Sequence, residues 1–165
     1  MTISRVLIAI GAAIVLAAIN VSILGKERII RDGAVIFLEL APRDPRSLVQ
    51  GDYMALRFQL AQEIESSFTQ IPGSVRLEGE KGLADIALDD KRVASLAKPG
   101  AAVADSLKFR YRIRKGAVWL GTNAFFFEEG TDRRYSSARY GEFRVDATSG
   151  EAVLTGLRDA QMKAL

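Results

Sequence analysis

The chain has 165 residues, an apolar fraction of 48%, a charged fraction of 26% and a formal net charge of +3, which is typical of a folded globular protein. Histidine and cysteine are both absent, which excludes disulfides, serine–histidine and cysteine–histidine catalysis, and the usual ligands of zinc and copper. We therefore assign no catalytic residue, metal or cofactor. The nearly balanced charge also argues against nucleic acid as a partner.

The N-terminal segment is the first predicted element. Residues 6–24 carry no charge, and a helix of that length reaches about 28 Å, close to the ~30 Å hydrocarbon thickness of a bilayer. We predict a single transmembrane anchor over residues 1–25 and one soluble β-rich domain over residues 26–165. A cleaved signal peptide is the alternative, but Ile23 and Gly25 occupy the place of a small-x-small cleavage site. We therefore favour an uncleaved signal-anchor.

The charges that flank the apolar run disagree about its orientation. Lys26, Arg28 and Arg31 outnumber Arg5 and the amino group, which favours a cytoplasmic domain. A short basic start before an apolar run is typical of an export signal. On this second ground we predict an extracytoplasmic domain.

One face of the predicted anchor carries small residues. Ala9, Ala13 and Ala17 recur every four residues, a spacing that permits close packing with another transmembrane helix. We therefore expect an integral membrane partner in addition to lipid. The alternative is that alanine is simply common in membrane anchors.

Alternation of apolar and polar residues dominates the rest of the chain and predicts strands. The spacing of Leu60, Ile64 and Phe68 predicts one short amphipathic helix that ends before Pro72-Gly73. The predicted strands cover residues 36–40, 54–60, 75–77, 84–88, 93–96, 107–113, 118–127, 139–146 and 152–157. We therefore predict a mainly β fold, an antiparallel barrel or sandwich that follows the single transmembrane helix.

A stiff connector, residues 42–58, leads into a Gly-Asp turn. Pro42 and Pro45 restrict their neighbours to extended shapes. The connector is either a structural turn or a polar rim that binds a partner. Its candidate binding residues are Asp44, Arg46, Gly51, Asp52 and Tyr53.

The stretch Gly51-Asp52-Tyr53-x-x-Leu56-x-Phe58 resembles the GDYXXLXY family, which is named for this motif. The resemblance extends to residues 44–48, 126–130 and 138–145 and so covers most of the soluble part. It implies an uncharacterised, membrane-associated bacterial protein, and hence the bacterial inner (cytoplasmic) membrane. Phe58 stands where the motif has tyrosine, which favours a core role for that ring over a reactive hydroxyl.

A basic stripe is predicted on one face of the strand at 107–113. Its members are Lys108, Arg110, Arg112 and Arg114, which alternate with apolar residues. The stripe could meet anionic lipid headgroups or an acidic protein. The alternative is a solvated face whose charges pair across strands with Glu128, Glu142 or Asp146.

Arg139 completes the candidate set. It shares strand parity with Phe143 and Val145, so we expect it to be buried and paired with Glu128 or Glu129. Tyr140 and Glu142, from the stretch that resembles the family, join the candidate binding residues.

Three functions compete on these grounds. The preferred one is a noncatalytic envelope module that assembles with a membrane partner. The second is a β domain that binds lipid or a small ligand in an unfilled interior. A hydrolase that uses carboxylates or a serine–lysine pair is the least favoured.

Overall fold

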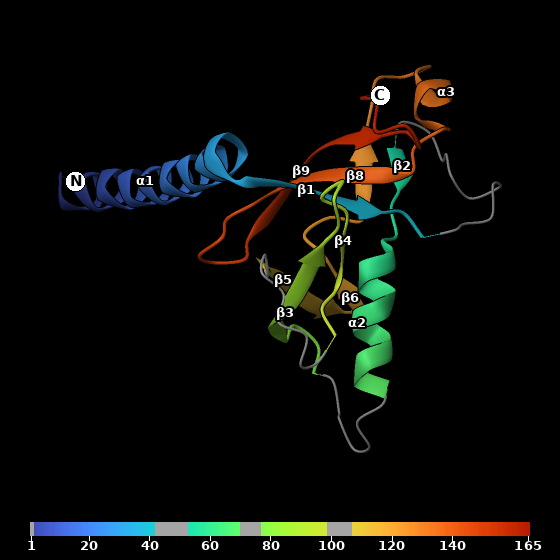
Figure 1. Ribbon diagram of the computed structural model, residues 1–165. Coiled ribbons are helices and arrows are strands. Elements are labelled where there is room, and N and C mark those ends of the chain that lie inside the picture. Colours follow the sequence, from blue (N-terminus) through green and yellow to red (C-terminus); the bar gives the residue numbers. More distant parts are fainter. Residues whose placement is uncertain (1, 42–52, 70–76, 99–106) are drawn as a thin grey trace.

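The structure is a computed structural model that describes residues 2–41, 53–69, 77–98 and 107–165 (Figure 1). A long helix, α1 (Thr2–Asp32), projects away from a β-rich domain. Its candidate membrane span, Val6–Asp32, is long and apolar enough to cross a bilayer, and the side chains of residues 6–24 are exposed. The helix extends beyond residue 25, the predicted end of the anchor, and ends at Asp32, just before the Gly33 junction with the first strand.

The last turns of α1 are fastened to the domain. Ile29 is buried, and the Lys26 ammonium forms an ion pair with Glu151. At the junction, the amide of Gly33 donates to the carbonyl of Ile29 at 2.9 Å. A Cβ at Gly33 would lie 2.4 Å from that carbonyl oxygen and 3.1 Å from the backbone of Val145, so only glycine fits there.

The first sheet has the order β1-β8-β9 and is antiparallel. Its strands are β1 (Ala34–Glu39), β8 (Tyr140–Val145) and β9 (Ala152–Arg158). One face is apolar, with Ile36, Leu38, Phe143 and Val145 each 0% exposed. A register shift between Glu142 and Phe143 interrupts the β8–β9 ladder.

The second sheet has the order β4-β3-β5-β6 and is also antiparallel. Its strands are β3 (Lys81–Leu88), β4 (Ala94–Leu96), β5 (Leu107–Arg114) and β6 (Ala117–Trp119). The predicted hairpin between β3 and β4 is present, and the Asp89 carboxylate accepts the amides of Lys91 and Val93 within it. The hairpin also bonds the first sheet, because the amide of Phe37 donates to the carbonyl of Arg92.

A two-stranded ribbon and two helices complete the domain. The ribbon pairs β2 (Tyr53–Ala55) with β7 (Ala124–Phe126), and the helices are α2 (Gln59–Thr69) and α3 (Asp132–Tyr135). The predicted helix is confirmed as α2, with Leu60 and Ile64 buried and Phe68 packed on the core. The prediction of a mainly β, antiparallel fold behind an apolar helix is therefore confirmed.

The two larger sheets face each other across an aromatic core. Phe143 of β8 meets Phe109 of β5 edge-on at 5.8 Å and Phe58, just before α2, at 5.3 Å. All three rings are at most 3% exposed. The core therefore joins both sheets and the start of α2.

Two strand predictions were wrong in extent. The predicted strand 54–60 is only β2, although Leu56 and Phe58 are buried as the alternation requires, because the extended backbone there makes single bonds to neighbouring segments. The predicted strand 118–127 is split into β6 and β7 at Gly121, whose φ is +87°. The predicted strand 75–77 lies mostly outside the described residues.

Candidate functional site

The tyrosine of the family motif belongs to an exposed pair of aromatic rings. Tyr53 opens β2 opposite Phe126 of β7, with their ring centroids 5.8 Å apart. Phe126 is 75% exposed and Tyr53 is 36% exposed, so this pair covers no core. The other candidates of the connector, Asp44, Arg46, Gly51 and Asp52, lie outside the described residues, and their binding role stays a prediction.

The apolar positions of the motif have a different role. Leu56 and Phe58 are 4% and 3% exposed, and the Phe58 ring contacts Phe143. The core role that the tyrosine-to-phenylalanine departure predicted for Phe58 is confirmed.

The basic stripe follows β5 as predicted, with Phe109 and Ile113 buried and the cationic side chains on the other face. Its expected cross-strand pairing with Glu128, Glu142 or Asp146 is wrong for the part of the chain that the structure describes. Instead the Arg110 guanidinium donates to the carbonyl of Ser149 at 2.9 Å, and Arg114 lies over the Trp119 ring, 4.9 Å from its centroid. Among the described residues, no carboxylate forms an ion pair with a member of the stripe.

Three members of the stripe, Arg110, Arg112 and Arg114, line one wall of a groove of about 240 Å³. We call it the basic groove. Its cationic and aromatic lining is Lys26, Lys81, Arg110, Tyr111, Arg112, Arg114 and Trp119, with Glu151 as its acidic member. The groove therefore brings together residues from α1, three strands of the second sheet (β3, β5 and β6) and the start of β9.

Asp146 belongs to the turn beside this groove rather than to an ion pair with the stripe. Its carboxylate accepts the amides of Ser149 at 2.6 Å and Thr148 at 3.1 Å. These hydrogen bonds, led by the one from Ser149, hold the pKa of the Asp146 carboxyl below its ordinary value. Asp146 thus fixes the shape of the turn that carries Ser149 and Glu151.

The expectation for Arg139 is wrong. Its side chain is exposed, and no described carboxylate pairs with it, because β8 begins only at Tyr140 and Arg139 precedes the buried part of the strand. Glu128 and Glu129 are exposed as well, and Tyr140 is half-buried. These four candidates do not converge on one site.

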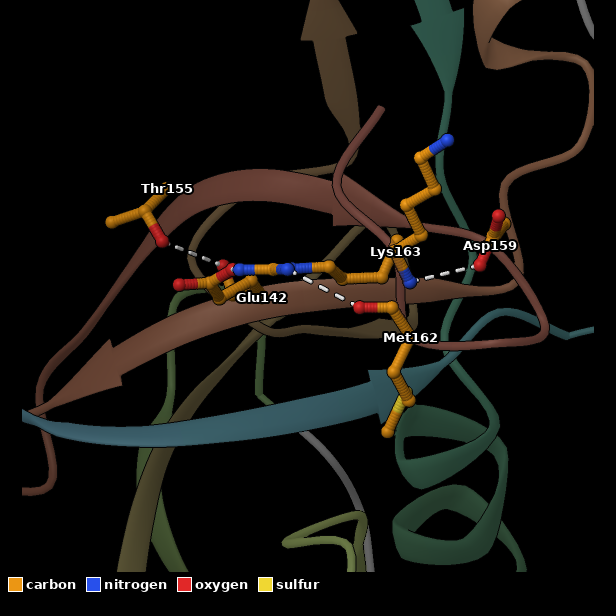
Figure 2. Close-up of polar contacts among 6 residues, drawn as sticks. Glu142, Thr155, Asp159, Met162 and Lys163 are labelled. Atoms are coloured by element: carbon orange, nitrogen blue, oxygen red, sulfur yellow. Dashed lines mark hydrogen bonds and ion pairs between the residues drawn. The ribbon is translucent and has the colours of Figure 1, made fainter.

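The half-buried ion pair of the domain joins Glu142 to Arg158 instead. The Arg158 Nε donates to the Glu142 carboxylate at 2.7 Å, and its Nη1 donates to the Met162 carbonyl at 3.2 Å (Figure 2). The Glu142 side chain is 14% exposed and the Arg158 side chain is 28% exposed. Sequence reasoning chose Glu142 but missed Arg158, because their contact depends on the register between β8 and β9.

We expect Glu142→Ala to lower the free energy of unfolding by about 2 kcal/mol, because it leaves a half-buried guanidinium without its carboxylate. A double-mutant cycle with Arg158→Ala, read by chemical unfolding, should give a coupling energy above about 0.5 kcal/mol. Additive losses would contradict a direct interaction between the two side chains.

A Ser-x-x-Lys sequence occurs at Ser95 to Lys98, but Ser95 lies in β4, and residues three apart in extended chain point to opposite faces. Within residues 2–41, 53–69, 77–98 and 107–165, no group of three or more acidic, histidine or cysteine side chains could hold a metal ion.

The fold and the site define a class of protein: a β-rich domain carried on one long apolar helix, with a basic groove where the two meet. The chain belongs to the GDYXXLXY protein family, whose family model matches residues 15–157. The matched region includes the second half of the apolar helix as well as the β domain. No curated protein and no solved structure matches the chain.

Proposed function

We propose that this protein is a noncatalytic, single-pass module of the bacterial inner membrane that assembles with an integral membrane partner. The observation that carries the proposal is the surface of α1. From Val6 to Leu24 its side chains are exposed, with Ile8 and Val21 at 72% and 70%. An apolar surface of this length that its own domain leaves uncovered is suited to lipid and to a partner helix.

The connection between α1 and the domain supports a retained anchor. The helix runs without a break into the Gly33 junction, and Ile29 and Lys26 fasten its last turns to the domain. The family match begins at residue 15, inside the apolar run. Both observations favour an anchor that belongs to the functional unit over a leader that is removed.

The partner proposal is tested by site-specific photocrosslinking in native membranes. A photoreactive amino acid at Ala13, in the centre of the alanine face, is expected to give a crosslink to one membrane protein. The same group at Val15 is the control, because two residues turn the helix by about 200° and place it on the opposite side. Reaction with lipid alone at both positions would contradict the assembly.

We also propose that the domain lies on the extracytoplasmic side. The chain has no cysteine, so a single cysteine introduced at the exposed Ala160 is a unique label site. In intact cells with the outer envelope permeabilised, a membrane-impermeant maleimide should label Ala160→Cys and spare Ile14→Cys. Labelling of Ala160→Cys only after lysis would place the domain in the cytoplasm.

A second candidate function is binding of a lipid or small ligand. The hollows among the described residues include ones of about 300, 190 and 240 Å³ that open to solvent, while the aromatic rings between the sheets pack against one another. An interior barrel pocket is thus not supported, and ligand binding is better argued at the surface. Of these hollows, the basic groove has the cationic lining that favours binding of an anionic ligand.

A further inference from the structure

The basic groove is formed where α1 enters the domain. Lys26 comes from the helix, and Glu151 comes from the turn between β8 and β9, which lies beside the last turns of α1 (Figure 1). The amide of Arg110 donates to the carbonyl of Gly150 at 2.8 Å, and its guanidinium reaches Ser149. These bonds tie the stripe on β5 to the same turn.

The position of Lys26 sets the height of the groove above the bilayer. Lys26 follows Leu24, the end of the apolar run, by two residues, which is about 3 Å along a helix. The headgroup layer on each side of the hydrocarbon is roughly 5–8 Å thick. If α1 spans the membrane, Lys26 and the turn that carries Glu151 therefore lie at headgroup level.

The groove has the charge that an anionic surface requires. It holds five cationic side chains and the one carboxylate of Glu151. Among the described residues, Lys26 is the only groove cation that pairs with a carboxylate. The nearby carboxylates of Glu78 and Glu80 accept the backbone amides of Lys115 and Leu77 instead.

The side chains also have the right shape for phosphate. The planar guanidinium groups of Arg110, Arg112 and Arg114 match phosphate oxygens in pairs, which an ammonium cannot do. Trp119 lies beside Arg112 in the β5–β6 ladder, and tryptophan is enriched at membrane interfaces. A groove of about 240 Å³ admits a headgroup but not a whole lipid.

We propose that the basic groove binds the phosphodiester headgroups of anionic lipids in the leaflet next to the domain. The proposal rests on the membrane span of α1 proposed above and is independent of any protein partner. Binding there holds the domain against the bilayer surface, with the stripe of β5 facing the headgroups.

Trp119 provides a direct test, because it is the only tryptophan of the chain and lines the groove. The full chain is placed in nanodiscs of phosphatidylcholine with increasing phosphatidylglycerol, and Trp119 emission is recorded. We expect a saturable change with the anionic fraction. Arg110→Gln/Arg112→Gln should weaken the apparent affinity about 25-fold, since each charge near an anionic surface contributes about fivefold.

The matched control is Arg133→Gln/Arg134→Gln, which removes the same charge from exposed positions on α3, away from α1 (Figure 1). This variant should titrate like the original protein. An equal loss in both variants would show a general charge effect and overturn the groove.

Competing ligands give two further outcomes. The same change with inorganic phosphate in pure phosphatidylcholine nanodiscs would assign the groove to a free anion. A change in Trp119 emission on adding a single-stranded oligonucleotide, without any response to phosphatidylglycerol, would assign it to nucleic acid. Either result overturns the lipid proposal. Alkaline carbonate extraction of the chain from membranes would instead refute the membrane span of α1, so the two failures are distinguishable.

Discussion

Replacing Phe143 with alanine is expected to lower the free energy of unfolding by about 3–5 kcal/mol. The ring is 0% exposed and lies edge-on to Phe109 of β5 and to Phe58 before α2. Alanine removes the contacts that join both sheets at this point and leaves a cavity that the neighbours fill only in part. Chemical unfolding of the full chain in detergent, followed by Trp119 emission, measures the change.

Phe126→Ala is the matched control, because it deletes the same atoms from a ring that is 75% exposed. Its effect should stay within about 0.5 kcal/mol, as for most surface substitutions. Similar losses for the two variants would contradict the assignment of Phe143 to the centre of the core.

Gly33→Val is expected to cost about 3 kcal/mol, through overpacking at the junction of α1 and β1. A Cβ at this position meets the Ile29 carbonyl oxygen at 2.4 Å and the backbone of Val145 at 3.1 Å. Both are main-chain atoms, so the helix must move relative to β8. The measurements are chemical unfolding and the rate of limited proteolysis around residue 33.

Gly25→Val serves as the control for Gly33→Val. Nothing lies within 4 Å of a Cβ built at Gly25, and valine is a better helix former than glycine. We expect no loss of stability from it. If Gly33→Val is tolerated equally well, the close packing of the junction is refuted.

The parts of the fold that were predictable from the sequence depend on local periodicity. The spacing of Leu60 and Ile64 identified α2, and alternation identified both faces of β5, because burial on one side imposes those periods directly. The end of α1 was not predictable in this way. Charged residues mark where the hydrocarbon ends, but lysine, glutamate and arginine are good helix formers, so the backbone stays helical to Asp32.

The candidate site was predicted in part for the same reason. The basic stripe could be predicted because it requires only the alternation within one strand. Its partners could not, because they depend on which strands are neighbours in the sheet. The prediction that Arg139 is buried was wrong because the alternation pattern does not show where a strand begins. Arg158 was missed because the register of β8 and β9, including its shift after Glu142, decides that the two side chains meet. Lys26 was missed as a groove residue because its partner in the groove, Glu151, is 125 positions away in the sequence.

Because α1 runs without a break into the domain, the length of the helix sets both the height and the rotation of the basic groove relative to the bilayer. Each residue added or removed between Leu24 and Lys26 would turn the domain by about 100° about the helix axis and shift it by about 1.5 Å. The number of helical residues between the alanine face and Lys26 therefore determines the angle between that face and the basic groove. A change of seven residues returns that angle to within about 20° of its original value, whereas a change of one, two or three residues does not.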